Sequence, residues 1–190
     1  MTFSGAEDRW QDVVILREAG ARAGAAITEA LVQAATWDGR SHLTAEQVTA
    51  DPHLARYVAG WPRAGDFGTI AVVDGVPVGA AWCRLFDAAE PGYGFVADDV
   101  LELSIGVLPD HRGTGIGTAL LAAVVEQATA RGLRAVSLSV EDGNPARALY
   151  ERAGFTAVGR SGGSDTMLLP LGPPGRRQDG TSSQVDRQNG

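Results

Sequence analysis

The chain has 190 residues, of which 44% are hydrophobic, and its formal net charge is −7. This length suits one domain, and the hydrophobic share is large enough for a core, which excludes a wholly disordered chain. The acidic balance argues against nucleic acid as the main partner and favours a basic small molecule or peptide. A single cysteine, Cys83, excludes an internal disulfide. No apolar run approaches the roughly 20 residues that cross a bilayer, and no signal peptide is visible, so we expect a cytoplasmic protein without a membrane span.

The first half of the chain predicts a strand, several helical segments and a β-hairpin. Thr44 and Gln47 have the spacing of a capping box, which predicts a helix start. Asp74-Gly75 between two apolar runs is typical of a hairpin turn. The expected elements are a strand at 13–16, helical segments at 20–35, from 44 and at 54–61, and strands at 69–73 and 76–86.

The second half begins with a polar loop at 87–99 and an alternating strand at 101–107. Aliphatic side chains at odd positions share one face of this strand, while Glu102, Ser104 and Gly106 share the other. Asn144-Pro145 is typical of a helix start, and Gly154 of a helix end. The remaining expected elements are a helix at 115–131, a helix from 144, and strands at 135–140, 155–158 and 166–171.

This order of elements fits a mixed α/β sheet with helices on both faces. We expect one domain over residues 1–171. Residues 172–190 contain one aliphatic side chain among many Gly, Pro, Gln and Ser residues, so they predict a disordered tail.

A glycine-rich turn joins the alternating strand to the helix that follows it. The turn reads Arg112-Gly-Thr-Gly-Ile-Gly-Thr118. Glycines leave the backbone amides of a helix start uncovered at the positive end of the helix dipole, which is typical of a phosphate or pyrophosphate site. Arg112 at its edge could add a charge-assisted hydrogen bond.

Three known phosphate-binding designs compete for this turn. The nucleotide P-loop requires a lysine that the turn lacks, and the dinucleotide fingerprint requires glycine where Thr118 stands. The third design is Arg/Gln-x-x-Gly-x-Gly/Ala, and residues 112–117 match it in full.

The third design is the pyrophosphate signature of the GNAT acetyltransferase superfamily, which the chain also resembles in a second motif. Residues 144–155 read Asn-Pro-Ala-Arg-Ala-Leu-Tyr-Glu-Arg-Ala-Gly-Phe and look like the family's Asn…Leu-Tyr-Glu-x-x-Gly-Phe helix. The clear resemblance covers residues 101–158, and the first hundred residues carry no diagnostic motif. The resemblance implies the family's mixed, mostly antiparallel sheet with splayed central strands and flanking helices.

The resemblance also implies which residues bind acetyl-CoA. Backbone groups late in strand 101–107 would hold the pantetheine arm in a gap beside residues 136–140. The loop amides would hold the pyrophosphate, and Asn144 would contact the cofactor near its thioester. The implied cofactor-binding residues are Ile105, Gly106, Val107, Arg112, Gly113, Thr114, Gly115, Ile116, Gly117, Thr118 and Asn144. No metal is expected, because the histidines and the cysteine lack metal-ligand spacing.

Two side chains are candidates for proton transfer. Tyr150 matches the tyrosine that lies near the sulfur in many members and can protonate the leaving thiolate. Glu102 is the candidate base, directly or through water, because the attacking amine must be neutral. The amide of Val107 is the expected donor to the thioester oxygen. Simpler interpretations stay open: Tyr150 as a core tyrosine, Glu102 as a solvated strand residue, and Asn144 as a helix cap.

The sequence therefore predicts an N-acetyltransferase that moves an acetyl or other short acyl group from acyl-CoA to an amine of a small molecule or peptide by direct attack. The alternative is a non-catalytic acyl-CoA-binding sensor or regulatory module. The sequence leaves open the acceptor, the acyl length and whether the chain forms a homodimer.

Overall fold

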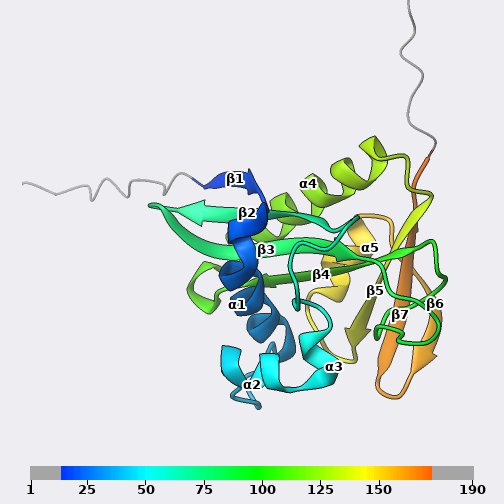
Figure 1. The fold of residues 1–190 in the computed structure, drawn as a ribbon, viewed down its shortest axis with the longest axis horizontal. Coiled ribbons are helices and arrows are strands. Elements are labelled where there is room, and N and C mark those ends of the chain that lie inside the picture. Colours follow the sequence, from blue (N-terminus) through cyan, green and yellow to red (C-terminus); the bar gives the residue numbers. More distant parts are fainter. Residues whose placement is uncertain (1–13, 173–190) are drawn as a thin grey trace, which may run out of the picture.

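Seven strands form one sheet in the order β1-β2-β3-β4-β5-β7-β6 (Figure 1). The computed structural model describes residues 14–172. The strands are β1 (Ile15–Glu18), β2 (Phe67–Val73), β3 (Val76–Arg84), β4 (Leu101–Val107), β5 (Ala135–Glu141), β6 (Thr156–Ser161) and β7 (Ser164–Pro170). Every neighbouring pair is antiparallel except β4 and β5, which are parallel. The predicted mixed, mostly antiparallel sheet is confirmed.

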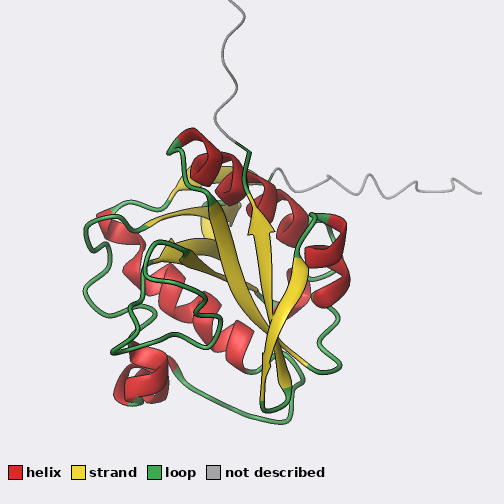
Figure 2. Ribbon diagram, turned by 90° about the vertical axis from the view of Figure 1, so that its right-hand side faces the viewer, coloured by secondary structure: helices red, strands yellow, loops and turns green. Residues whose placement is uncertain are grey.

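Helices lie on both sides of the sheet, as Figure 2 shows. One side carries α1 (Gly24–Ala35), α2 (Ala45–Ala50) and α3 (Pro52–Ala55), and the other carries α4 (Ile116–Ala130) and α5 (Arg147–Arg152). Short 3-10 helices precede α1 (Ala21–Ala23) and follow β4 (Pro109–His111). Two hydrophobic cores result, because both faces of the sheet are covered. Leu120, Val124 and Tyr150 belong to the α4 side, and Ile27, Val48 and Trp82 to the α1 side. In residues 14–172 no helix is long and apolar enough to cross a membrane.

Two local sequence signals are confirmed in detail. Thr44 and Gln47 form both hydrogen bonds of the predicted capping box at the start of α2. Asp74 and Gly75 both have positive φ angles, of 50° and 82°, in the turn between β2 and β3. A two-residue hairpin turn of this kind requires positive φ at both positions, which Asp-Gly tolerates.

Three expected elements differ from the structure. Val13 and the tail after residue 172 lie outside the described residues, and β1 begins at Ile15. The helix expected over 54–61 ends at Ala55, and the turn that follows is held by the Arg84 guanidinium. The helix expected from Asn144 begins at Arg147, because the Asn144 side chain caps a preceding turn through the amide of Ala146.

The two central strands separate soon after they meet. β4 and β5 pair only at Leu101 with Val136 and at Glu102 with Ser137. Beyond these two positions β4 continues to Val107 and β5 to Glu141 without pairing to each other. The splayed central strands implied by the resemblance are therefore present.

Gly106 allows α1 to lie directly on β4. A Cβ atom at this position would lie 1.9 Å from the carbonyl oxygen of Ala30 in α1. The backbone of Ala30 cannot withdraw without moving the helix, so this contact requires glycine.

We expect Gly106→Ala to lower the free energy of unfolding by roughly 1–3 kcal/mol, because the added methyl group overpacks the α1–β4 contact. Urea denaturation followed by circular dichroism measures this change. Gly24→Ala in α1 is the control, because a Cβ at that position has no neighbour within 4 Å. This variant should be neutral or slightly stabilising. Equal stability of both variants would contradict the close approach.

Candidate active site

The edge of β4 that faces β5 carries unpaired backbone groups. The amide of Leu108 donates to the carbonyl of Val78 on β3 at 2.8 Å. Because hydrogen bonds alternate along an antiparallel pair, the backbone groups of Val107 and Ile105 point the other way, toward β5. The carbonyl of Val107 accepts from Nε of Arg112 at 3.0 Å, which agrees with this direction. The two positions expected to bind pantetheine thus line the gap.

The glycine-rich loop presents a run of free amides beside that gap. Gly113 and Gly115 have φ angles of 75° and 93°, and Gly115 precedes α4 without a side-chain cap. Within the described part of the chain, the amides of residues 113–118 have no hydrogen-bond acceptor. These amides lie at the positive end of a 15-residue helix, where an anion is stabilised.

Arg112 fixes the start of the glycine-rich loop through hydrogen bonds of its backbone and its side chain. Its amide donates to the carbonyl of Pro109 at 3.1 Å. The run of amides predicted to start at Arg112 therefore starts at Gly113. The Arg112 guanidinium contacts the carbonyl of Val107 and two oxygens of Gln33, at 3.3 and 3.2 Å. The side chain thus ties the loop to the end of β4 and to α1.

Glu102 lies at the point where β4 and β5 part, and its side chain is buried. Only 4% of the residue is exposed, because α1 and the β3–β4 loop cover this face of the sheet. The interpretation of Glu102 as a solvated strand residue is therefore wrong. Its Oε1 accepts from the hydroxyl of Tyr57 at 2.8 Å and from the amide of Gly94 at 2.9 Å.

Burial raises the pKa of Glu102 from 4.5 to about 7, although the hydrogen bonds from Tyr57 and Gly94 oppose the shift. Desolvation disfavours the charged carboxylate, and the two donors favour it. A carboxyl with a pKa near neutrality is suited to accept and release a proton at physiological pH.

Tyr150 lies on the opposite side of the sheet from Glu102. It belongs to the α4-side core, where its ring packs 5.9 Å from the ring of Phe155. Burial raises the pKa of its hydroxyl above the ordinary value, so the group is protonated at neutral pH. A Cβ on Gly117 would lie 3.6 Å from Leu149, which places α5 next to the glycine loop. Glu102 and Tyr150 thus flank the central strands from opposite faces and do not contact each other.

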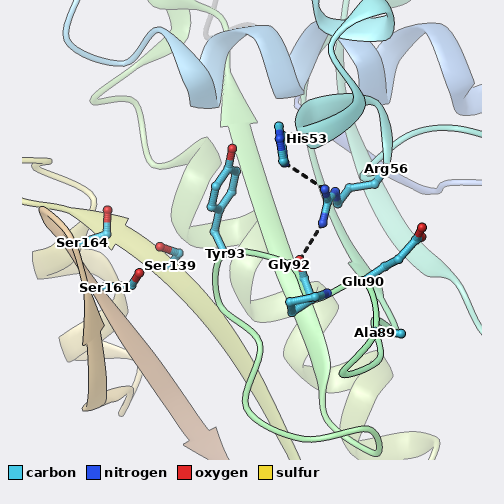
Figure 3. A pocket seen from close by; sticks show the side chains of 10 residues that line it. His53, Arg56, Ala89, Glu90, Gly92, Tyr93, Ser139, Ser161 and Ser164 are labelled. Carbon is cyan, nitrogen blue, oxygen red and sulfur yellow. Dashed lines mark hydrogen bonds between the residues drawn. The ribbon is translucent and has the colours of Figure 1, made fainter.

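A pocket of about 450 Å³ opens on the α1 side of the sheet. Figure 3 shows His53 and Arg56 on one side of it and three serines, from β5 and the β6–β7 hairpin, on the other. Its lining residues are His53, Arg56, Ala89, Glu90, Pro91, Gly92, Tyr93, Ser139, Ser161 and Ser164. Arg56 donates to the carbonyl of Pro91 at 2.7 Å, which links the turn after α3 to the β3–β4 loop.

A single layer of backbone separates this pocket from Glu102. Gly92 lines the pocket, and a Cβ on it would lie 2.1 Å from Oε2 of Glu102. No other residue type fits there without displacing the carboxylate. The candidate base therefore lies directly behind the pocket wall.

Sequence reasoning missed Tyr57, Arg84 and Asp66, which build the surroundings of Glu102. Arg84 is fully buried and forms an ion pair with Asp66 at 2.5 Å. A charged residue within the apolar run 79–86 was the one signal that could have drawn attention to this pair. Cys83 in the same run is fully buried. Among residues 14–172 no group of three or more His, Cys, Asp or Glu side chains could hold a metal ion.

Comparisons with known proteins agree with this geometry. Residues 29–155 match the Acetyltransferase (GNAT) family. The chain is 36% identical over 63 residues to a ribosomal protein bS18-alanine N-acetyltransferase of Haemophilus influenzae, covering 33% of this chain and 43% of that protein. It is 39% identical over 83 residues to a mycothiol acetyltransferase of Thermobispora bispora, covering 43% of this chain and 27% of that protein.

A solved structure extends the likeness to most of the chain. A putative acetyltransferase from Salmonella typhimurium, solved with its cofactor acetyl-CoA, has a TM-score of 0.61 and 27% identity, over 84% of this chain and 95% of that chain. The chain belongs to the GNAT acetyltransferase family. It spans less than half of the length of the two curated relatives named above.

The buried carboxyl of Glu102 should make folding stability depend on pH. Its native pKa of about 7 exceeds the value of 4.5 expected for the unfolded chain. The native state therefore binds more protons between these values, and stability falls as the pH rises from 4.5 through 7. The loss at pH 8 relative to pH 4 is on the order of 3 kcal/mol.

Glu102→Gln should remove this pH dependence and raise the melting temperature at pH 8, because the amide oxygen still accepts from Tyr57 and Gly94 while the charge is gone. Thermal unfolding at several pH values measures the effect. Glu46→Gln, an exposed position in α2, is the matched control. A wild-type pH dependence in Glu102→Gln would show that another group causes it.

Proposed function

We propose that this protein is an N-acetyltransferase that transfers an acetyl group from acetyl-CoA to an amine. The observation that carries the proposal is the open edge of β4, which runs into the unpartnered amides of residues 113–118. An extended pantetheine arm can pair with such an edge as another strand would, and a pyrophosphate suits the amides at the helix start. Relatives named as N-acetyltransferases, and a structural relative solved with acetyl-CoA, support the same conclusion.

The residues present fit each part of the cofactor. Ile105 and Val107 supply backbone groups for pantetheine, and Gly106 keeps α1 close behind them. The amides of residues 113–118 supply donors for the pyrophosphate. Val107 offers its amide to the thioester oxygen, and Asn144 lies beyond the end of β5, on the approach to α5.

In the proposed reaction the amine nitrogen attacks the thioester carbon, and the carbon–sulfur bond breaks. Glu102 takes the proton that the nitrogen must lose through a water molecule, because the backbone of Gly92 lies between the pocket and its carboxylate. Tyr150 gives a proton to the departing thiolate from the opposite face of the sheet. Glu102 and Tyr150 lie on opposite faces of the sheet, so the two proton transfers would take place on different sides of the reacting carbon.

The amine would occupy the pocket in front of Glu102. The pocket is lined by Glu90 as well as Arg56, and the net charge of the chain favours a cationic acceptor. The two curated relatives are named for different acceptors, a ribosomal protein alanine and mycothiol. The names of these relatives therefore do not identify the acceptor of this chain. The cytoplasmic location and a homodimer stay predictions.

A panel of amines with acetyl-CoA, read by thiol release, tests the proposal. At least one amine should release thiol faster than buffer alone and yield an acetylated product by mass spectrometry. The alternative, a sensor module that binds acyl-CoA without catalysis, predicts tight CoA binding with no product from any amine.

Gly117→Glu should abolish CoA binding, because it places bulk and negative charge where the phosphates belong. Isothermal titration calorimetry with CoA measures the loss, which we expect to be at least roughly 100-fold in Kd, since one charge repulsion plus one clash exceeds about 3 kcal/mol. Gly24→Glu adds the same side chain at an open position and is the control. Unchanged affinity in Gly117→Glu would refute the phosphate site.

Tyr150→Phe should slow turnover by about 10- to 1000-fold and leave CoA affinity nearly unchanged, because only the proton donor is lost. Glu102→Gln should be similarly impaired. In the wild type, kcat/KM should rise as the pH increases through about 7, where Glu102 loses its proton. Steady-state kinetics over pH 5.5–9 supplies these values. Full activity in both variants would assign proton transfer to other groups.

A further inference from the structure

The two oxygens of the Glu102 carboxylate have different surroundings. Oε1 accepts two hydrogen bonds, from the Tyr57 hydroxyl and the Gly94 amide. Oε2 is buried and has no hydrogen-bond partner within residues 14–172. A buried carboxylate oxygen without a donor is costly, so its retention points to a use. Oε2 is the oxygen that is free to take a proton.

Tyr57 is positioned by the sheet, although it follows the single-turn helix α3. The indole Nε1 of Trp82 on β3 donates to the carbonyl of Tyr57 at 3.0 Å. Arg84, also on β3, donates to the carbonyl of Arg56 at 2.7 Å and is held by its buried ion pair with Asp66. These contacts fix the backbone on both sides of the Tyr57 ring, which is itself 4% exposed.

The Tyr57 hydroxyl also holds the backbone that covers Glu102. It accepts from the amide of Tyr93 at 2.7 Å while it donates to Glu102. The rings of Tyr57 and Tyr93 stack with centroids 6.0 Å apart and an interplanar angle of 12°. A Cβ on Gly92 would lie 2.9 Å from this hydroxyl, so the covering backbone is closely fitted to it.

We propose that Tyr57 is a positioning residue for Glu102: its hydroxyl fixes Oε1 and the covering backbone at 92–94, which leaves Oε2 to accept the proton of the amine through a water molecule. This inference rests on the proposed role of Glu102 as the base. Tyr57 itself keeps its proton, because burial and the charge of Glu102 raise its pKa far above the ordinary value.

Tyr57→Phe tests the inference, since it removes the hydroxyl and keeps the ring. The lost hydrogen bond favoured the ionised carboxylate, so the pKa of Glu102 should rise. The acid limb of the kcat/KM profile should move to higher pH by about half to one unit, with a roughly two- to fivefold loss of kcat/KM at pH 7. The KM for acetyl-CoA should not change. Two amines of different pKa separate the limb of the enzyme from that of the substrate.

The other charged groups around Glu102 stay as they are in this variant. Arg56 lies on the same turn as Tyr57, and Arg84 stands opposite Glu102 on β3 with Asp66 as its partner. From β5, the in-register neighbour is Ser137, which does not titrate in this range. The shift of the limb therefore reports the Tyr57 hydroxyl.

Phe86→Leu is the control for a purely structural role. Its ring lies 4.9 Å from that of Tyr57, so the variant loosens the same cluster but keeps the hydroxyl. It should lower the melting temperature and leave the acid limb in place. If Tyr57→Phe fails to fold, Trp82→Phe removes the donor to the Tyr57 carbonyl and should shift the limb in the same direction by a smaller amount.

The outcomes separate this inference from the proposed function. A wild-type limb in the folded Tyr57→Phe or Trp82→Phe variant, together with an inactive Glu102→Gln, overturns the role of Tyr57 and leaves Glu102 as the base. Full activity of Glu102→Gln overturns the base and the inference together. The inference is supported if the acid limb of the kcat/KM profile moves to higher pH in Tyr57→Phe and stays in place in Phe86→Leu.

Discussion

The separation of β4 from β5 is the constraint on which the rest of the structure depends. Two strands that meet in parallel at Leu101 and Glu102 would normally continue to pair, because each further residue satisfies backbone groups. Here the β3–β4 loop packs against β5 just past the last pair. A Cβ on Gly94 would lie 2.5 Å from the carbonyl carbon of Leu138. At the other end of the gap, Arg112 takes the free carbonyl of Val107. The β3–β4 loop and the Arg112 side chain thus occupy the two ends of the gap, and the edge of β4 between them stays open.

This separation also decides where Glu102 and Tyr150 lie, the two groups proposed to transfer protons. Glu102 is the last paired residue of β4, so it stands at the apex of the gap, on the side of α1. Tyr150 approaches the same strands from the side of α4. Each group is buried, and burial raises the pKa of each group, which favours its protonated form. For Tyr150 the shift keeps a proton available to give. For Glu102 it brings the carboxyl close to neutrality, where accepting a proton costs little, and it destabilises the fold at higher pH. The donors from Tyr57 and Gly94 limit that cost without cancelling it.

Local patterns in the sequence were sufficient for most elements and for the loop geometry on which the proposed cofactor site rests. Three motifs are each one continuous segment of the chain: the alternating strand at 101–107, the glycine-rich loop and the 144–155 motif. Their local structure therefore depends on neighbouring residues and can be predicted from the sequence. The burial of Glu102 was beyond such patterns. A polar position on an alternating strand suggests a solvated face, and only the packing of Ala30 onto Gly106 shows that α1 covers it. Tyr57 was missed for the same reason: it meets Glu102 across 45 residues of sequence. The sequence also could not show that the free amides start at Gly113, because this depends on the hydrogen bond from the Arg112 amide to the Pro109 carbonyl.

The two halves of the site differ in how they are built, and this difference bears on specificity. The proposed acetyl-CoA side comes from one continuous segment around β4 and α4. The pocket side combines the turn after α3, the β3–β4 loop, β5 and the β6–β7 hairpin, which are distant in sequence. The buried pair of Arg84 and Asp66 fixes the first of these pieces to the sheet, close to Glu102. Residues such as Glu90 and Ser161 lie further out and make no contact with Glu102. Under the proposed function, the lining of the pocket can change with the acceptor while Glu102, Tyr57 and the open edge of β4 keep their geometry.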